Sequence, residues 1–516
     1  MQSTVILLKD QEVLVLGLGA SGLAMARWCA RQGARVTVAD TREHPPNLAA
    51  LNALVPTAVF LFGPLNERLI AARDFAHVFV SPGLAPSSYA MLLIANNSNN
   101  SSAKGELSLF DSALTVLKSA HGYAPQVIAV TGTNGKTTVT SLTGQLIERA
   151  GKSVAVAGNI GPSLLDTLSE RMDNNTLPDV WVIELSSFQL HPVDGFEPTV
   201  ATVLNITQDH LDWHGTLQAY TAAKTKVFGA TGLMVLNRDD AAVMAMLPST
   251  PSPTSGKERK NKERPQARDY VTFGAGMPTR PGDFGIEDVN GMAWLVRAQE
   301  ADGARRKRNE APEDLYIQRL MPADALRIRG RHNAVNALTA LALAAAAGCV
   351  LAPLLYGLRD YQGEPHRVES VGTVNEVEFF DDSKGTNVGA TIAALNGLGA
   401  ERKLVVILGG EGKGQDFTAL AAPVGRYART VVLIGRDAPQ LRTALASAGV
   451  PMLDAASMAQ AVDLANRAAR AGDAVLMSPA CASFDMFENY GHRAAVFCDA
   501  VKALARSAGL VMEGRS

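Results

Sequence analysis

The sequence has few cysteines and almost no net charge. Its four cysteines, Cys29, Cys349, Cys481 and Cys498, are scattered over 516 residues and show no CxxC spacing. This pattern argues against a disulfide framework and a cysteine zinc site, and it fits a reducing cytosol. The formal net charge is only −2, so no overall field attracts nucleic acid or an acidic membrane. We therefore expect no nucleic-acid partner.

The sequence also lacks the pattern of a signal peptide and of a membrane span. Residues 1–9 have neither a charged amino-terminal region nor a cleavage site. One long hydrophobic run, 337–358, is mostly alanine and is interrupted by Gly348 and Pro353. It predicts a buried helix that ends near Gly348 and a second helix that Pro353 opens. We expect a cytoplasmic protein with no membrane span.

The length and the order of the segments predict three domains. A chain of this length forms roughly two to four domains. Apolar strands alternate with helical segments, which predicts an α/β fold with mainly parallel sheets throughout. We place the domains at 1–122, 123–363 and 364–516. The first and last are expected to be Rossmann-like, and the central one to be a P-loop type of ATP-binding domain.

Three polar or charged segments interrupt this pattern. Residues 96–102 are rich in Asn and Ser, which predicts a mobile loop. Residues 249–268 and 301–314 carry many charges, but they lack the interleaved aromatic residues of a nucleic-acid site. We interpret both as surface insertions.

A glycine-rich turn follows the first predicted strand, 12–16. It reads Gly17-Leu-Gly-Ala-Ser-Gly22, and the next predicted strand ends at Asp40. A GxGxxG turn with an acidic residue after the second strand is typical of dinucleotide sites. Another strand, 78–80, leads into Ser81-Pro-Gly83. Ligands of open α/β sheets bind at such carboxyl ends of strands.

The most informative run is Thr131-Gly-Thr-Asn-Gly-Lys-Thr-Thr138. It lies between an apolar, β-branched segment, 126–130, and a segment with helical spacing, 139–147. A strand, a glycine-rich turn and a helix place backbone N–H groups around an anion. Lys136 can reach the outer phosphates of a nucleotide, and the Thr137 hydroxyl can bind Mg²⁺. The run predicts binding of a nucleoside triphosphate; the alternative is an ordinary strand-to-helix turn, because Thr131 replaces the first glycine of the full motif.

Polar residues follow the next two predicted strands. Glu184 comes directly after strand 180–183, and His210 follows strand 199–204. A carboxylate and an imidazole at neighbouring strand ends can hold Mg²⁺ or position phosphates. Lys224 falls in a predicted helix, and its sequence context alone indicates only a solvated lysine.

The last third of the chain offers further candidates. Asn333 and Asn336 share a helix face, so they either read an adenine edge or cap that helix. The acid, base and hydroxyl groups of 381–387 follow strand 377–380, and the alternative there is a polar loop. Lys413 adds a positive charge to a glycine-rich turn. Ser483 and neighbouring N–H groups can hold a carboxylate.

Taken in order, these motifs resemble the Mur ligase family of ATP-dependent amide-forming enzymes. The residues that carry the resemblance extend over nearly the whole chain: 17–22, 81–83, 132–138, 158–161, 184–189, 209–210, Lys224, 330–333, 366–367, 382–387 and 478–485. The Asp-Asn-Pro-Arg motif of members that add a diamino acid is not found. Residues 381–384 and 479–485 look like those of the members that add D-glutamate. The two insertions depart from the compact family pattern.

The resemblance implies the reaction and the partners. The chain would join D-glutamate to UDP-N-acetylmuramoyl-L-alanine through an acyl phosphate, with ATP and Mg²⁺. This is a cytoplasmic step of peptidoglycan synthesis, carried out by a monomer whose C-terminal domain closes before the chemistry. The resemblance also implies that Lys224 is carbamylated, which turns a cation into an anion that supports the metal site.

The resemblance further implies a role for each matching residue. The uridine diphosphate part of the substrate would contact Ala20, Ser21, Asp40, Thr41, Ser81, Pro82 and Gly83. ATP would be bound by Gly132, Thr133, Asn134, Gly135, Lys136, Thr137, Thr138, Asn333, Asn336, Arg367 and Asp382. D-Glutamate would be received by Lys413, Ser483 and Phe484, with Lys384 and Thr386 close by. The catalytic residues would be Lys136, Asn159, Glu184, His210 and Lys224, and the metal ligands Thr137, Glu184, His210 and Lys224.

Three rival readings remain at this point. An NAD-dependent dehydrogenase would account for the first glycine-rich turn and Asp40, but it leaves the second phosphate loop unexplained. A nucleotide-gated binding module would bind ATP without phosphate release. A different amino-acid ligase of the same family, such as the folylpolyglutamate type, conflicts with the uridine-type N-terminal domain.

Overall fold

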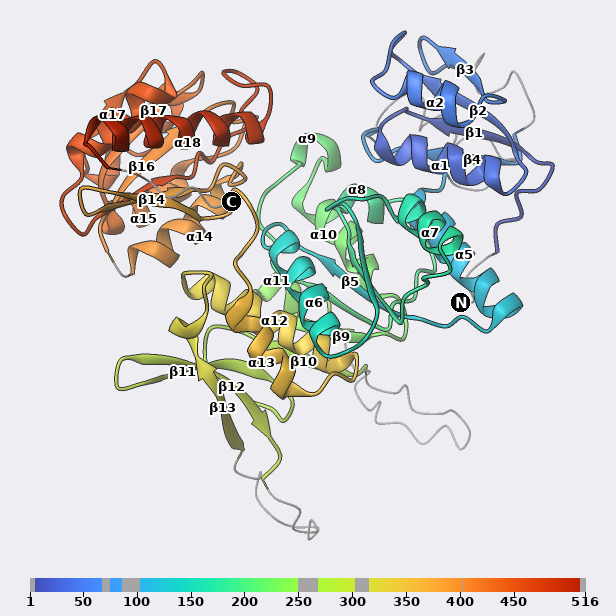
Figure 1. Cartoon of the computed structure of the whole chain (residues 1–516), viewed down its shortest axis with the longest axis horizontal. Helices are drawn as coiled ribbons and strands as arrows, with labels where there is room; N and C mark the ends of the chain where they lie inside the picture. Colours follow the sequence, from blue (N-terminus) through green and yellow to red (C-terminus); the bar gives the residue numbers. More distant parts are fainter. Residues whose placement is uncertain are drawn as a thin grey trace, which may run out of the picture.

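The structure is a computed structural model, and it describes residues 5–66, 75–85, 103–248, 268–301, 315–400 and 402–510. Figure 1 shows three lobes, with the N-terminal lobe (blue) and the C-terminal lobe (orange to red) on either side of the middle lobe. Each lobe has its own mostly parallel sheet, as predicted. The expected loop 96–102 and nearly all of the two expected insertions lie outside the described residues.

The N-terminal lobe is a parallel sheet of four strands in the order β3-β2-β1-β4. Its strands are β1 (Glu12–Leu16), β2 (Arg35–Asp40), β3 (Val59–Phe62) and β4 (His77–Val80), with helices α1 (Ala20–Arg31) and α2 (Leu48–Leu54). Four of the five residues of β1 are buried. A central strand buried on both faces needs a continuous apolar run, which explains why the sequence located this strand correctly.

The first glycine-rich turn depends on close contact between helix and turn. A Cβ atom added to Gly22 would lie 1.9 Å from the carbonyl oxygen of Gly17. Because that neighbour is backbone, the turn itself would have to move. The third glycine of the motif therefore allows α1 to pack against the end of β1.

We expect Gly22→Ala to destabilise the N-terminal lobe by about 3 kcal/mol or more, at the upper end of the cost of overpacking. Thermal unfolding measures this effect. Gly276→Ala is the matched control, because no described atom lies within 4 Å of a Cβ built there. Equal unfolding temperatures for the two variants would contradict the packing argument.

α5 (Glu106–His121), inside the expected domain 1–122, packs against helices of both the N-terminal and the middle lobe. The middle lobe contains a parallel six-stranded sheet, in the order β10-β9-β8-β5-β7-β6. The strands are β5 (Gln126–Thr131), β6 (Val154–Gly158), β7 (Val180–Glu184), β8 (Val200–Val203), β9 (Leu233–Asn237) and β10 (Tyr270–Phe273). The helices are α6 (Lys136–Arg149), α7 (Leu164–Asp173), α8 (Ser187–Leu190), α9 (Leu211–His214), α10 (Leu217–Thr225), α11 (Ala241–Met244), α12 (Arg331–Ala346) and α13 (Leu351–Asp360).

The hydrophobic run 337–358 forms parts of two helices, as predicted; the first is mostly buried, and the second is buried along one side only. α12 ends at Ala346, just before Gly348, and Pro353 lies in the first turn of α13. Among the described residues, no helix has the length and apolar character needed to cross a membrane.

The sheets are mainly parallel, as predicted, and strands pair antiparallel at two places. A separate sheet of β11 (Phe284–Val289), β12 (Met292–Gln299) and β13 (Tyr316–Pro322) is antiparallel. Figure 1 shows it at the far side of the middle lobe from the other two lobes. In the C-terminal lobe, β14 (Glu369–Val374) and β15 (Val377–Asp381) also pair antiparallel. Two residues join β11 to β12 and two join β14 to β15, and such short connections permit only antiparallel pairing, because parallel pairing needs a long crossover.

The C-terminal lobe is otherwise parallel, in the order β14-β15-β19-β16-β17-β18. Its remaining strands are β16 (Leu404–Gly409), β17 (Ala428–Ile434), β18 (Met452–Asp454) and β19 (Ala474–Met477). Its helices are α14 (Val388–Gly399), α15 (Ala421–Tyr427), α16 (Ala438–Ala444), α17 (Met458–Ala468) and α18 (Tyr490–Ser507). The predicted strand 377–380 corresponds to β15, which is one residue longer.

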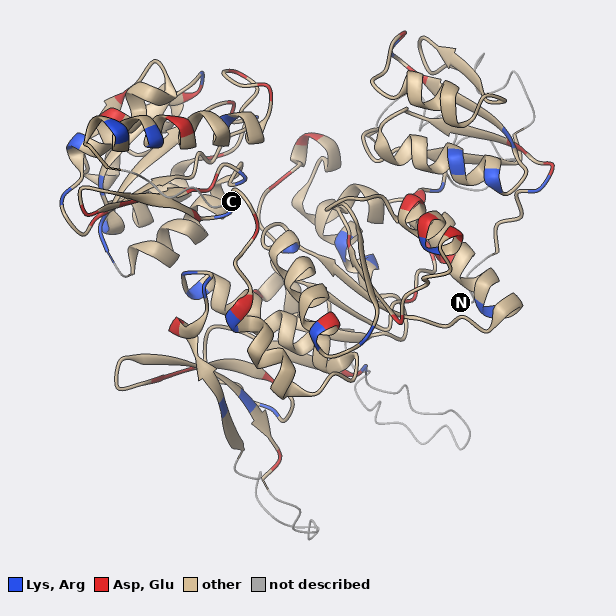
Figure 2. Cartoon of the chain, in the orientation of Figure 1, with Lys and Arg blue, Asp and Glu red and all other residues tan. Residues whose placement is uncertain are grey.

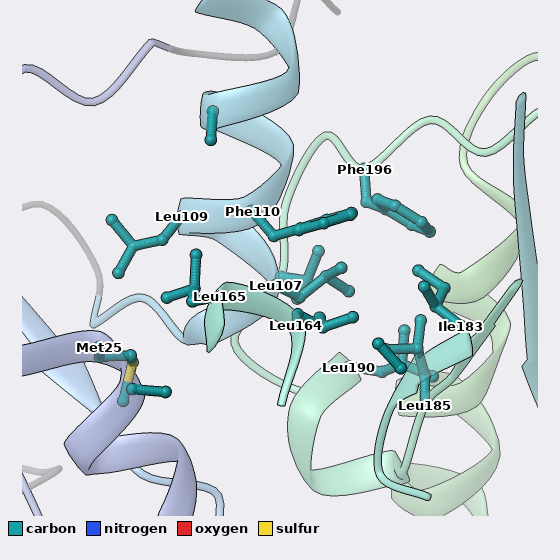
Figure 3. Close-up of a cluster of buried hydrophobic side chains, with 14 of the residues drawn as sticks. Met25, Leu107, Leu109, Phe110, Leu164, Leu165, Ile183, Leu185, Leu190 and Phe196 are labelled. Carbon is teal, nitrogen blue, oxygen red and sulfur yellow. The ribbon is translucent and has the colours of Figure 1, made fainter. Parts of the chain in front are cut away.

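The N-terminal and middle lobes share one hydrophobic core. It joins Met25 of α1 to side chains of α5, α7 and β7. Figure 3 shows Leu107 of α5 beside Leu164 of α7, and Phe110 of α5 directed toward Phe196. Burial of such a shared cluster stabilises the relative placement of the two lobes.

Candidate functional site

The phosphate loop joins β5 to α6. Gly132 has φ +151° and Gly135, the residue that caps α6, has φ +83°. A Cβ on Gly132 would lie 2.9 Å from Leu204 Cβ, so both the backbone conformation and the space favour glycine there. α6 begins at Lys136, earlier than the apolar spacing indicated, so its free N–H groups face the loop.

Lys136 folds back over this loop. Its Nζ donates hydrogen bonds to the carbonyl oxygens of Gly132 at 3.0 Å and Thr133 at 2.9 Å. Burial lowers the pKa of Lys136, and the negative charges of Glu184 and Asp209 oppose that shift. The lysine is therefore held at the position where a phosphate group would replace the carbonyl contacts.

Glu184 is the last residue of β7, whereas the sequence analysis placed it directly after this strand. Its side chain is buried, and its Oε1 accepts a hydrogen bond from Asn159 Nδ2 at 2.6 Å. Its Oε2 has no hydrogen-bond partner among the described residues. A buried carboxylate oxygen without a partner is costly, and a divalent cation would satisfy it.

We expect Glu184→Gln to lower turnover on the order of a hundredfold and to shift the Mg²⁺ dependence to higher concentration, because the amide lacks the charge that attracts the cation. Titration of activity with Mg²⁺ measures both changes. Glu197→Gln is the control, since that carboxylate accepts hydrogen bonds from the amides of Ala230 and Thr231 and from the Thr231 hydroxyl. An unchanged Mg²⁺ dependence would remove Glu184 from the metal site.

Lys224 is buried, which corrects the reading of a solvated side chain that its sequence context gave. It lies on α10, and its Nζ donates to Gly132 O at 2.8 Å and Thr131 Oγ1 at 3.2 Å. The same nitrogen lies 4.8 Å from the centroid of the Tyr220 ring. Burial, and then the nearby charge of Lys136, hold the pKa of Lys224 well below its ordinary value.

His210 lies at the same edge of the sheet, at the start of α9. It has a left-handed backbone, its ring centroid is 4.6 Å from that of Phe188, and its Nε2 is 3.6 Å from Asp209 Oδ2. Asp209 and Glu184 both interact electrostatically with Lys136 and Lys224. The structure thus brings the predicted acid, imidazole and lysines together beside the phosphate loop.

The sequence analysis did not identify two residues of this region, Asn205 and Tyr220. The Asn134 amide donates to Asn205 Oδ1 at 2.8 Å, and Asn205 Nδ2 donates back to Asn134 O at 3.1 Å. The Tyr220 hydroxyl lies 3.0 Å from Thr133 Oγ1. Both residues fix the loop from neighbouring elements. The position of Asn205 directly after a strand was the available signal.

A pocket lies between the phosphate loop and the C-terminal lobe. Arg367 Nη2 donates to Thr137 Oγ1 at 2.7 Å, and Asn387 Nδ2 donates to Asn134 Oδ1 at 3.2 Å. The predicted nucleotide-binding residues that line the pocket are Asn134, Gly135, Thr138, Asn333, Asn336, Arg367 and Asp382. The pocket thus includes residues from both lobes.

Asn333 and Asn336 share one face of α12, as predicted. Asn336 Nδ2 donates to Asn333 Oδ1 at 3.1 Å, and Asn333 Nδ2 donates to Arg329 O at 2.8 Å. Asp382 is buried and accepts a hydrogen bond from Ser478 Oγ at 2.6 Å; burial raises the pKa of Asp382 to about 7. The pocket therefore offers amide groups and a carboxyl group for hydrogen bonding.

Two loops predicted to receive an amino acid meet at the carboxyl edge of the C-terminal sheet. Glu411 and Ala482 exchange backbone hydrogen bonds of 2.9 Å, which pair the loops. Lys413 Nζ lies 5.4 Å from the ring centroid of Phe484, which is 63% exposed. Ser483 is buried beneath them. An exposed ammonium beside an exposed ring suits a small anionic ligand.

Lys384 and Thr386 lie on the loop between β15 and α14. Lys384 Nζ lies 3.7 Å from the ring centroid of Tyr490, and the Thr386 amide donates to Lys384 O at 2.9 Å. Lys384 also lines the nucleotide pocket. This loop therefore extends between the nucleotide pocket and the amino-acid loops.

The three turns of the N-terminal lobe also meet at one sheet edge. The Gly17 amide donates to Ala39 O and the Ser81 amide to Leu16 O, both at 2.8 Å. Asp40 accepts from the Leu18 amide at 2.7 Å and from two nitrogens of Arg42. The hydrogen bonds from Arg42 lower the pKa of Asp40 to about 2, so the carboxylate stays charged.

The remaining predicted contacts of this lobe lie around the same turns. Ala20, Thr41 and Gly83 are exposed, Ser21 and Pro82 are half-buried, and Ser81 is largely buried. The geometry brings them together at the carboxyl ends of β1, β2 and β4, where open α/β sheets bind ligands.

Family models match most of the chain. The Mur ligase MurD-like N-terminal domain matches residues 11–100, the Mur ligase middle domain matches 130–277, and the Mur ligase glutamate ligase domain matches 366–481.

Curated relatives match at high identity. The UDP-N-acetylmuramoylalanine–D-glutamate ligase of Albidiferax ferrireducens is 66% identical over 507 residues, covering 98% of this chain and 99% of that protein. The ligase of the same name from Ralstonia nicotianae is 55% identical, covering 97% and 98%.

Solved structures share the fold at low identity. The MurF ligase of Thermotoga maritima in complex with ADP has a TM-score of 0.55 at 16% identity, covering 97% of this chain and 96% of that chain. The MurC ligase of the same organism has a TM-score of 0.53 at 19% identity, covering 96% and 100%.

Proposed function

This chain belongs to the Mur ligase family, and from that premise we infer that it joins D-glutamate to UDP-N-acetylmuramoyl-L-alanine at the expense of ATP. The reaction is a step of peptidoglycan synthesis. The observation that supports this conclusion is that three relatives named UDP-N-acetylmuramoylalanine–D-glutamate ligase are 54–66% identical to this chain, over at least 97% of its length.

The three matched segments favour a division of labour along the chain. We assign the uridine diphosphate substrate to domain 1–122, ATP to domain 123–363 and D-glutamate to domain 364–516. The turns at 17–22, 131–138 and 478–485 lie at the carboxyl edges of three separate sheets. The substrates therefore meet only where the lobes face one another.

The residues of the phosphate loop activate the carboxylate of the substrate. Its terminal L-alanine carboxylate attacks the γ-phosphorus of ATP, and ADP leaves with the electron pair of the broken P–O bond. Lys136 offsets the charge that builds up on the transferred phosphoryl group. Asn159, held by Glu184, lies beside this region and orients the substrate.

The C-terminal lobe supplies the amine. Lys413, Ser483 and Phe484 bind D-glutamate, and its deprotonated amine attacks the carbonyl carbon of the acyl phosphate. The tetrahedral intermediate collapses to the amide and releases phosphate. Contacts such as Arg367 to Thr137 bring the C-terminal lobe onto the phosphate loop, which excludes water that would hydrolyse the acyl phosphate.

The residues beside the loop fit a magnesium site. Glu184, with its unpartnered buried oxygen, together with His210, Thr137 and Lys224, would hold Mg²⁺. Bound Mg²⁺ offsets the repulsion between the carboxylate and the triphosphate. Since CO₂ adds only to a neutral amine, the lowered pKa of Lys224 supports carbamylation, which would add an anion to this site.

Phosphate release from ATP tests the proposed reaction. Purified protein with UDP-N-acetylmuramoyl-L-alanine and Mg²⁺ is compared with D-glutamate, L-glutamate and other amino acids. We expect release that requires both the uridine substrate and D-glutamate. Equal phosphate release with D-glutamate and L-glutamate, or no release with any amino acid, would contradict the proposed reaction.

A further inference from the structure

A buried carboxylate lies where the N-terminal and middle lobes meet, and the reaction described above does not use it. Glu106 is the first residue of α5 and is only 2% exposed. Its Oε1 accepts a hydrogen bond from the Leu165 amide at 3.1 Å, whereas its Oε2 has no hydrogen-bond partner among the described residues. Because a half-satisfied buried carboxylate is costly, its presence needs an explanation.

Three helices converge on this carboxylate. Figure 3 shows α1 with Met25, α5 with Leu107 and α7 with Leu164 and Leu165 around the shared core. The Ser21 hydroxyl, in the first turn of α1, and the amides in the first turn of α7 all interact with the Glu106 carboxylate and favour its charge. Glu106 therefore connects the beginnings of α1 and α7.

These two helix beginnings belong to different parts of the substrate site. Ser21 lies in the glycine-rich turn assigned to the uridine diphosphate group. α7 is preceded by the loop that carries Asn159, which donates to Glu184 Oε1 beside the phosphate loop. One substrate molecule has to extend from the first of these places to the second.

The other polar contacts between α1 and α7 differ from this one. Arg27 pairs with Asp166 at 2.6 Å, and Arg31 pairs with Asp173 at 2.7 Å, in both cases with partly exposed side chains. Figure 2 shows basic residues on α1 and acidic residues on the neighbouring α7. Exposed pairs of this kind contribute little to stability. These two pairs are partly exposed, whereas Glu106 is buried and interacts with the first turns of α1 and α7.

A purely stabilising role does not account for Glu106. Burial works against its ionisation, and so does the neighbouring negative charge of Asp166. An apolar side chain would fill the same core without these costs. The Leu165 amide of α7 donates to this buried carboxyl group, and the Ser21 hydroxyl of α1 interacts with it from the other lobe.

We propose that Glu106 is a positioning residue that fixes the turn 17–22 relative to the Asn159 loop, so that one substrate molecule reaches both. The proposal rests on the proposed function, because it uses the assignment of these two places to the uridine diphosphate and acyl ends of the substrate. It predicts that Glu106 matters only for a ligand that spans both lobes.

Calorimetric titration with two ligands tests this role. UDP contacts only the N-terminal turn, whereas UDP-N-acetylmuramoyl-L-alanine spans both places. We expect Glu106→Ala to bind UDP as the wild type does and to lose affinity for the full substrate on the order of tenfold, because small misplacements of a site have effects of at least this size. The KM for ATP should not change. Asp173→Asn, which removes an exposed α1–α7 pair, should leave both affinities unchanged.

Glu106→Gln keeps the shape and the acceptor oxygen but loses the charge. We expect it to lose full-substrate affinity about threefold, since charge-assisted hydrogen bonds are roughly twice as strong as neutral ones. This variant also carries the test if thermal unfolding shows that Glu106→Ala does not fold.

Three results would overturn the proposal: equal losses for UDP and the full substrate in Glu106→Ala, no loss for either ligand, or unchanged full-substrate affinity in Glu106→Gln. Failure of the wild type to bind the full substrate is a separate result. It would count against the proposed function rather than against the connection that Glu106 makes.

Discussion

Lys136→Ala is expected to abolish phosphate release while the protein stays folded. Among the described residues, the Nζ of Lys136 donates hydrogen bonds to two carbonyl oxygens of its own loop, and alanine is favourable in a helix, so we expect the fold to lose little. The transferred phosphoryl group loses its closest fixed positive charge. The loss of one such preorganised group lowers turnover by about a hundredfold to a thousandfold. Phosphate release with all substrates and thermal unfolding measure the two parts of the prediction.

Lys152→Ala is the matched control for this variant. Lys152 is in the same lobe and also donates to a carbonyl oxygen, that of Ala347, and to Gln126 Oε1 at 3.2 Å. Gln126 is the first residue of β5, so this lysine lies at the amino end of the strand, opposite the phosphate loop. We expect near-normal turnover from the control. Near-normal turnover from Lys136→Ala would exclude Lys136 from phosphoryl transfer.

Lys224→Ala is expected to lower amide formation on the order of a hundredfold, as the loss of a group that supports a metal site does. Two causes combine in this variant: the buried amine that braces Gly132 is removed, and no carbamate can form. In the wild type, removal of CO₂ from the buffer should lower turnover in the same direction. Carbon-13 NMR after addition of labelled bicarbonate should show a carbamate signal in the wild type and none in the variant.

Lys226→Ala tests whether the loss of another lysine nearby in the sequence has the same effect as the loss of Lys224. Lys226 follows two residues later, is partly exposed and donates to His191 O at 2.6 Å. We expect this variant to keep both the carbamate signal and the dependence on CO₂. If the wild type shows neither, Lys224 acts as an amine and the carbamate proposal is wrong.

The sequence predicted an element correctly where the residues that define it are close together in the chain. β1 was located to the residue, because a strand buried on both faces is a continuous apolar run between polar ends. The antiparallel sheet of β11 to β13 was missed. Its strands are only partly buried, and their polar and apolar residues do not alternate cleanly. A strand of that kind gains its stability from its neighbours, which the local pattern does not reveal.

The features of the candidate site likewise fall into those that the sequence predicted and those that it did not. The phosphate loop and the first glycine-rich turn could be predicted, because the backbone conformation and close packing of a few consecutive residues require their glycines. The burial of Lys224 was not evident, because α10 and β5 are far apart in the sequence and come into contact only in the folded domain. The same holds for the contact from Arg367 to Thr137, which joins residues 230 positions apart.

The sequence by itself determined the three α/β domains, the phosphate loop, the family and the reaction, because each of these is encoded in short runs of residues or in similarity along the chain. The tertiary structure alone decided which side chains are buried and which meet. Glu184 was left with an unpartnered oxygen, Lys224 with a lowered pKa and Glu106 between two lobes. Desolvation and long-range contacts set these properties, and both exist only once the chain has folded.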